Sequence, residues 1–171
     1  MKKWMLVMMA SAFLSFIQID RSHATDVFLF IQGVPGEAAQ APHANWIHVE
    51  SAAWGHVGKA PFEPLGVAKV VDISSPLLAL AAADGRRFQT AILDVTKPGA
   101  QAQPMTFLKV ILTDVTVKAY AAAANNGSNN PTETVKLGFA KIEWVYQKQM
   151  PDGSLSAPVR TGWDVINSKP F

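Results

Sequence analysis

The chain has 171 residues, 49% of them hydrophobic and 16% charged, a composition typical of one globular domain with its own core. It contains no cysteine, which excludes disulfides, thiolate catalysis and cysteine metal sites. The formal net charge of +2 falls to 0 without residues 1–24, since 12 basic and 12 acidic residues then remain. A neutral domain lacks the clustered Lys and Arg that bind phosphate backbones, so no nucleic-acid partner is expected.

The first 24 residues have the three parts of a secretory signal peptide. Two lysines follow the first Met, residues 4–19 are mostly apolar and uncharged, and Ser22 and Ala24 offer small side chains for cleavage. We therefore expect a signal peptide over residues 1–24 and one domain over residues 25–171, in a secreted or periplasmic protein. The alternative is an uncleaved anchor, although an apolar run of about 16 residues is shorter than the roughly 20 that span a membrane.

The domain begins with an apolar strand over residues 26–32, which a turn over residues 33–36 ends. Because it is apolar on both faces, we expect the core to cover one face and a neighbour or another subunit to cover the other. A second strand is predicted over residues 46–54, with Ile47, Val49 and Ser51 on one face.

Residues 55–66 contain two prolines and are predicted to form a loop, after which residues 67–73 return as a strand. A short helix follows. Ser75 is the expected N-cap, Pro76 occupies the first helical position, and Gly85 ends the helix. The Leu and Ala content of this helix favours packing against a sheet.

Three further strands are predicted over residues 86–96, 105–120 and 159–166, the last containing Trp163. Turns are expected at residues 97–99 and 151–153, and a loop of strong turn formers at residues 125–131.

Residues 133–146 form the most informative segment, because the apolar pattern changes phase within one predicted strand. Odd-numbered apolar residues give way to even-numbered ones: Val135, Leu137 and Phe139, then Ala140, Ile142, Trp144 and Tyr146. Side chains alternate between faces, so one extra residue near Phe139 and Ala140 restores a single buried face. This pattern predicts a β-bulge that bends the strand as a barrel requires. About seven strands and one short helix indicate a barrel or a sandwich.

No catalytic or metal site is predicted. The spacing of His43, His48 and His56 matches no common zinc pattern. Four acidic residues could suggest a carboxylate pair, but their positions are those of solvated side chains: Asp72, Asp94, Asp114 and Glu143. Neither a nucleophile elbow nor a phosphate-binding glycine loop occurs, so we expect no enzyme and no cofactor.

The tryptophans allow two interpretations. They could form a carbohydrate platform, since aromatic rings stack on apolar faces, or they could pack in the core. Core packing is favoured, and the expected core aromatics are Trp54, Phe139, Trp144 and Trp163.

Taken in order, the segments resemble the Hcp family (haemolysin-coregulated protein), which forms the inner tube of the type VI secretion system. The matching segments are residues 26–37 (DVFLFIQGVPGE), 47–51 (IHVES) with Trp54 and Gly55, 72–78 (DISSPLL), 112–117 (LTDVTV), 133–142 (ETVKLGFAKI) with Tyr146, and 162–164 (GWD). The resemblance covers about residues 25–167. Its specificity lies in the order and spacing of the segments together.

The resemblance implies a small closed β-barrel of antiparallel strands with one short flanking α-helix. It also implies a structural, non-enzymatic subunit, six copies of which form a ring whose central channel can carry effector proteins. Rings of such proteins stack into a tube with a tip protein, and the loop after the second strand contacts the adjacent ring. Here the candidate stacking loop carries Lys59, Pro61, Phe62, Glu63 and Pro64.

The leader departs from the family pattern, since tube subunits assemble in the cytoplasm and need no export signal. Either the chain forms a periplasmic or extracellular ring, or the true start lies near Thr25. The alternative function is a secreted, monomeric binding module on the same barrel, with Trp46 or Phe62 contacting a glycan or protein ligand.

Overall fold

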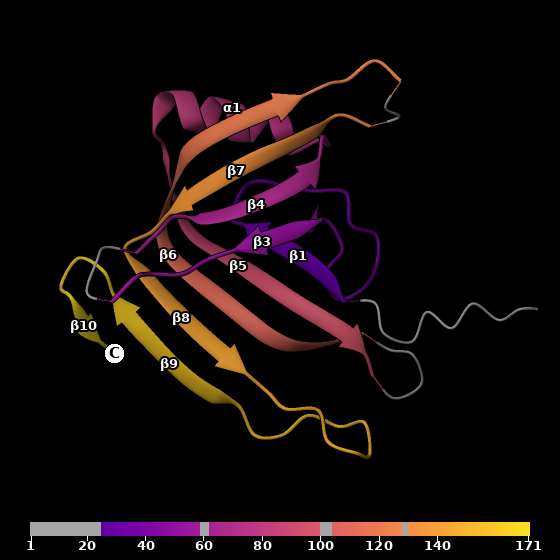
Figure 1. Cartoon of the computed structure of the whole chain (residues 1–171), viewed down its shortest axis with the longest axis vertical. Helices are drawn as coiled ribbons and strands as arrows, with labels where there is room; N and C mark the ends of the chain where they lie inside the picture. The colour runs from indigo at the N-terminus through magenta and orange to yellow at the C-terminus, as the bar shows by residue number, and fades with distance from the viewer. Residues whose placement is uncertain (1–24, 59–61, 100–103, 128–129) are drawn as a thin grey trace, which may run out of the picture.

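The computed structural model describes residues 25–58, 62–99, 104–127 and 130–171 (Figure 1). The predicted leader lies outside the described residues, as do Lys59 and Pro61. The elements in chain order are β1 (Asp26–Ile31), β2 (Ile47–Val49), β3 (Ser51–Ala53), β4 (Leu65–Val70), α1 (Ser75–Asp84), β5 (Arg87–Pro98), β6 (Pro104–Ala123), β7 (Thr132–Gly138), β8 (Lys141–Tyr146), β9 (Val159–Asp164) and β10 (Lys169–Pro170). The mainly β class with one short helix, predicted above, is confirmed. No helix among the described residues is long and apolar enough to cross a membrane.

All strand pairs are antiparallel, and the 20-residue strand β6 lies at the centre of the sheet. On one side β6 pairs with β5. On its other side β7 pairs with the second half of β6, and β8 pairs with the first half. One wall continues from β7 through β4 to β3, and the other from β8 through β9 to β10 (Figure 1). Both walls therefore depend on the same strand.

The sheet comes nearest to closing at the chain segment that contains β2 and β3. Strand β2 pairs with β1, whereas β3 pairs with β4. Only Glu50 separates β2 from β3, and its N–H donates to the Ala68 carbonyl at 2.9 Å. No described strand pairs with both β1 and β4, so the cylinder expected from the sequence is interrupted at this point. The segment from β2 to β3 thus links the two ends of the sheet, because it pairs first with β1 and then with β4.

The predicted change of phase is present after β7. Val135 and Leu137 lie in the core, and so does Ile142, which has the opposite parity. However, the predicted bulge within one strand is wrong in detail, because the strand stops over Phe139 and Ala140 and resumes as β8. The register shift lies on the facing strand β6, between Val117 and Ala119. The bend is thus shared by both strands, and it lets β7 and β8 join different walls.

The chain itself covers the outer face of β1. Leu29 and Ile31 face the core, whereas Phe28 is buried on the opposite face. The His43 ring stacks on Phe28 with centroids 4.4 Å apart, and Trp46 packs on Phe30 at 5.4 Å. The second cover predicted for this strand therefore comes from the connection between β1 and β2.

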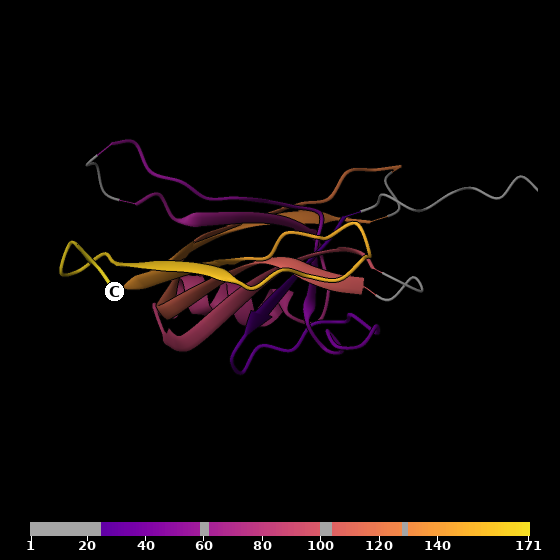
Figure 2. The ribbon, with the colours of Figure 1, turned by 90° about the horizontal axis from the view of Figure 1, so that it is seen from below.

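Helix α1 lies against the barrel wall (Figures 1 and 2). Its N-cap is Ser74, so the expected cap Ser75 is the first helical residue and Pro76 the second. The Ser75 hydroxyl accepts the Asp72 N–H at 3.0 Å. Gly85 ends the helix with a φ of 69°, as expected. Leu78 is buried against β6, while Leu80 is 50% exposed. The helix is therefore apolar both on the side of Leu78, which faces the sheet, and on the side of Leu80, which faces solvent.

A buried ion-pair network holds the start of α1 against the sheet. Lys69, on β4, is fully buried, and its Nζ donates to Asp72 and Glu133 at 2.8 Å each. The Tyr120 hydroxyl donates to the other Glu133 oxygen at 2.7 Å. Burial and, secondly, this hydrogen bond raise the pKa of Tyr120 to about 12. The charged groups are thus satisfied by one another rather than by water.

Several strand boundaries differ from the prediction. The second strand divides at Glu50, and Ser51 is exposed while Ala52 packs against the core. Strand β4 begins two residues earlier and ends three residues earlier than expected, and β5 continues through the predicted turn to Pro98. Strand β10 has only two residues, too few to give a periodic pattern.

Candidate functional site: an aromatic pocket

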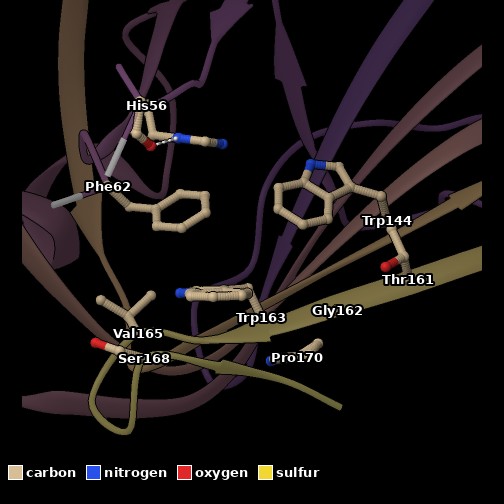
Figure 3. A pocket seen from close by; sticks show the side chains of 10 residues that line it. His56, Phe62, Trp144, Thr161, Gly162, Trp163, Val165, Ser168 and Pro170 are labelled. Carbon is tan, nitrogen blue, oxygen red and sulfur yellow. Dashed lines mark hydrogen bonds between the residues drawn. The ribbon is translucent and has the colours of Figure 1, made fainter. Parts of the chain in front are cut away.

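A cavity of about 830 Å³ lies between the loop after β3, the β8–β9 hairpin and the C-terminal segment (Figure 3). This volume is in the range of small-ligand sites and of sockets for a few side chains. Its lining consists of His56, Gly58, Phe62, Trp144, Thr161, Gly162, Trp163, Val165, Ser168 and Pro170.

Four ring side chains surround the open space in Figure 3. The Phe62 ring lies 4.6 Å from the His56 ring and 6.0 Å from the Trp144 ring, measured between centroids. His56 Nδ1 donates to the Gly58 carbonyl at 3.0 Å, so its Nε2 is the ring nitrogen that points into the space. Trp163 forms the opposite side. The pocket is therefore an aromatic cage with a few polar atoms on its walls.

The described part of the lining carries no formal charge, since none of its described residues is Lys, Arg, Asp or Glu. Within the described part of the chain, no hydrogen bond occupies the indole N–H of Trp144 or Trp163. Two donors and several aromatic faces suit a group that is apolar in bulk and carries carbonyl or ether oxygens.

Three of the predicted loop and core residues line this pocket: Phe62, Trp144 and Trp163. Phe62 lines it, Pro64 is half-buried, and Glu63 is exposed with its N–H donating to the Gly55 carbonyl at 3.1 Å. The four aromatics expected in the core are half-buried and pack against it: Trp54, Phe139, Trp144 and Trp163. Two of them, Trp144 and Trp163, also line the pocket. Trp46 takes no part, since it packs on β1.

Sequence reasoning missed the contribution of the C-terminal segment. Ser168 and Pro170 line the pocket, and the Phe171 ring packs on Gly162 so closely that a Cβ there would lie 2.6 Å from it. A lone glycine inside the pattern of a strand was the available signal, because it often marks such a close approach.

The carboxylates and histidines considered above do not gather into one site. Each carboxylate has its own cation: Lys69 for Asp72, Lys109 for Asp94, Arg87 for Asp114 and Arg160 for Glu143. His43 is buried, with Nε2 3.0 Å from Asp94, whereas His56 belongs to the pocket. No group of three or more potential metal ligands occurs among the residues that the structure describes.

Fold and site together define a small antiparallel β scaffold with an aromatic pocket and exposed apolar side chains. Residues 28–146 match the family model for the type VI secretion system effector Hcp. Protein hcp1 of Pseudomonas aeruginosa is 31% identical over 158 residues, covering 83% of this chain and 96% of the relative. The chain belongs to the Hcp family of type VI secretion tube proteins.

Solved structures agree with this assignment. The crystal structure of Hcp1 from Salmonella typhimurium aligns with a TM-score of 0.77 and 28% identity, over 86% of this chain and 99% of that one. A structure described as a type six secretion system protein aligns with a TM-score of 0.80 and 29% identity, over 86% of this chain and 100% of that one.

Proposed function

We propose that this chain is a structural subunit of a type VI secretion inner tube, and that it assembles into hexameric rings with a central channel able to carry effector proteins. The observation that carries the proposal is the coverage of the relatives, which match this chain over 96% to 100% of their own length. We infer a role without catalysis from membership of the same family.

The distribution of apolar surface supports self-association. A ring is a heterologous assembly, in which one face of a subunit contacts a different face of the next. Two separate regions offer exposed apolar side chains, one on the outer side of α1 around Ile73 and Leu80, and one at the pocket around Ile166 and Phe171. The near-zero net charge of residues 25–171 also keeps self-repulsion low.

Native mass spectrometry and negative-stain electron microscopy of residues 25–171 test the proposal. We expect a hexamer and ring-shaped particles. A strictly monomeric species at tens of micromolar, with no rings on the grid, would rule the proposal out.

A second candidate function is favoured by the pocket itself. A monomeric binding module on the same fold would hold a neutral ligand between Phe62, Trp144 and Trp163. Ring formation that survives a Phe62→Ala substitution, without any ligand found in a glycan screen, would favour the tube subunit over this module.

We also propose that residues 1–24 act as an export signal that is removed after Ala24. Mass measurement of the N-terminus of the protein purified from its host tests this directly. A mature chain that begins at Thr25 supports export, whereas a retained Met1 supports an anchor.

A further inference from the structure

The turn after β8 forms a projecting tip held by its own hydrogen bonds. Met150 N–H donates to the Ser154 carbonyl at 2.8 Å, and Gly153 N–H donates to the Met150 carbonyl at 2.9 Å. Asp152 accepts hydrogen bonds from the N–H and the hydroxyl of Ser154, at 2.9 and 2.7 Å. We call residues 149–155 the hairpin tip. Because it is already ordered, it would lose little conformational freedom on docking.

The hairpin tip presents apolar groups to solvent. Met150 is 41% exposed, and Pro151 beside it is exposed as well. A methionine sulfur packs favourably against aromatic rings, and a proline ring offers an apolar face that stacks on them. These are the groups that an aromatic cage accepts.

The pocket lies toward the other end of the same hairpin. The β8–β9 ladder runs from Lys141 opposite Asp164 to Tyr146 opposite Val159. Six residue pairs separate the two ends by roughly 17 Å at the usual rise of a strand. In both Figure 1 and Figure 2 the turn after β8 and the C-terminal segment lie on opposite sides of the molecule.

The rim of the pocket distinguishes a protein partner from a small ligand. Three large apolar side chains next to lining residues are strongly exposed: Val57, Ile166 and Phe171. A small ligand would leave this surface in water, whereas a protein segment would cover it. Lys169, between two lining residues, adds an exposed positive charge opposite in sign to Asp152 on the hairpin tip.

We propose that the aromatic pocket is a socket for the hairpin tip of a second copy, with Met150 and Pro151 inserted between Phe62, Trp144 and Trp163. This inference rests on the proposed function and deepens it, because it names the two surfaces by which one ring docks on the next. His56, Gly58 and Phe62, from the connection between β3 and β4, supply one side of this pocket. Because socket and tip lie at opposite ends of the hairpin, each docked copy leaves a free socket and a free tip. The contact therefore repeats along one direction without closing.

Cross-linking tests the contact directly, since the chain has no cysteine of its own. Met150→Cys and Ser168→Cys are introduced together, stacked rings are treated with a short bismaleimide, and the products are separated on a denaturing gel. We expect a ladder that extends beyond six copies. Each single variant should give no ladder.

Four outcomes decide the matter. A ladder beyond six copies supports the tip in the socket of the next ring. A ladder that stops at or below six, from stacks that electron microscopy shows to contain more than six rings, would overturn the proposal. Stacked rings without any ladder would also overturn it and leave the pocket to a small neutral ligand. Absence of rings in the parent protein would instead refute the proposed function.

A charge variant gives a second measurement. Met150→Asp places a carboxylate against the rings of Phe62, Trp144 and Trp163, where it loses its hydration, and we expect single rings in place of stacks, with at least a tenfold higher concentration needed for stacking. Asn125→Asp is the matched control, because it adds the same charge on an exposed loop outside both surfaces. Stacking of Met150→Asp at the parent's concentration would contradict the proposal.

Discussion

Replacement of the buried cation Lys69 by methionine should destabilise the fold severely. Lys69 Nζ lies 2.8 Å from both Glu133 Oε1 and Asp72 Oδ1, and the Glu133 side chain has no exposed surface. In Lys69→Met, methionine fills much of the same volume but leaves Glu133 as an unpaired buried charge. Breaking a buried ion pair by removing one partner costs about 3–5 kcal/mol.

This loss is large beside the total stability of a domain, which is about 5–15 kcal/mol. For a domain of this size it corresponds to a fall of roughly 10 °C in the melting temperature. Urea unfolding followed by tryptophan fluorescence, at one fixed protein concentration, measures the change, since assembly also shifts apparent stability.

Two further variants separate the charge effect from packing. The double variant Lys69→Met with Glu133→Gln removes the uncompensated charge and keeps an acceptor for the Tyr120 hydroxyl, so it should recover part of the loss. Arg160→Ala breaks an exposed pair with Glu143 and should cost about 1 kcal/mol or less. A loss below about 1 kcal/mol for Lys69→Met alone would refute the reasoning.

The remaining predictions concern stability. Phe139→Asp should lower the free energy of unfolding by about 2–4 kcal/mol, because Phe139 packs against the core, and a thermal melt at the parent's midpoint would contradict this. Gly36→Ala should cost about 1–3 kcal/mol in urea unfolding, since its Cβ would lie 2.3 Å from the Trp46 carbonyl oxygen, whereas Gly55→Ala, with no atom within 4 Å, should be neutral. The raised pKa of Tyr120, about 12 in the folded state, stabilises the fold below pH 10, and this stability should be lost as the pH rises from 10 to 12. Because Tyr120 is only half-buried, about 1 kcal/mol is expected, and Tyr120→Phe should reduce the loss of stability across this window by that amount.

Local patterns predicted the elements well where one rule dominated. The apolar run before Gly33 gave β1, and Pro76 and Gly85 bracketed α1. The change of phase after Leu137 was also visible, because a period of two is strict in strands. The division of this segment into β7 and β8 was not visible. It depends on tertiary pairing, because β7 pairs with β4 whereas β8 pairs with β9.

The candidate site was harder to predict because it is assembled from distant segments. Phe62, Trp144 and Ser168 belong to three parts of the chain that sequence reasoning could not bring together without the register of β8 and β9. The tryptophans were interpreted as core or as platform, and the structure gives Trp144 and Trp163 contacts with both the core and the pocket. Lys69 gave no signal at all, since an isolated lysine in a strand is ordinarily solvated.

Strand β6 has a mechanical consequence. Its neighbours flank it on both sides, and the hydrogen bonds of an antiparallel ladder lie perpendicular to the strands. A force directed along β6 therefore strains many of these bonds simultaneously, instead of opening them one after another from an end. The subunit should therefore withstand a larger force along β6 than a force that separates β10 from β9 at the edge of the sheet.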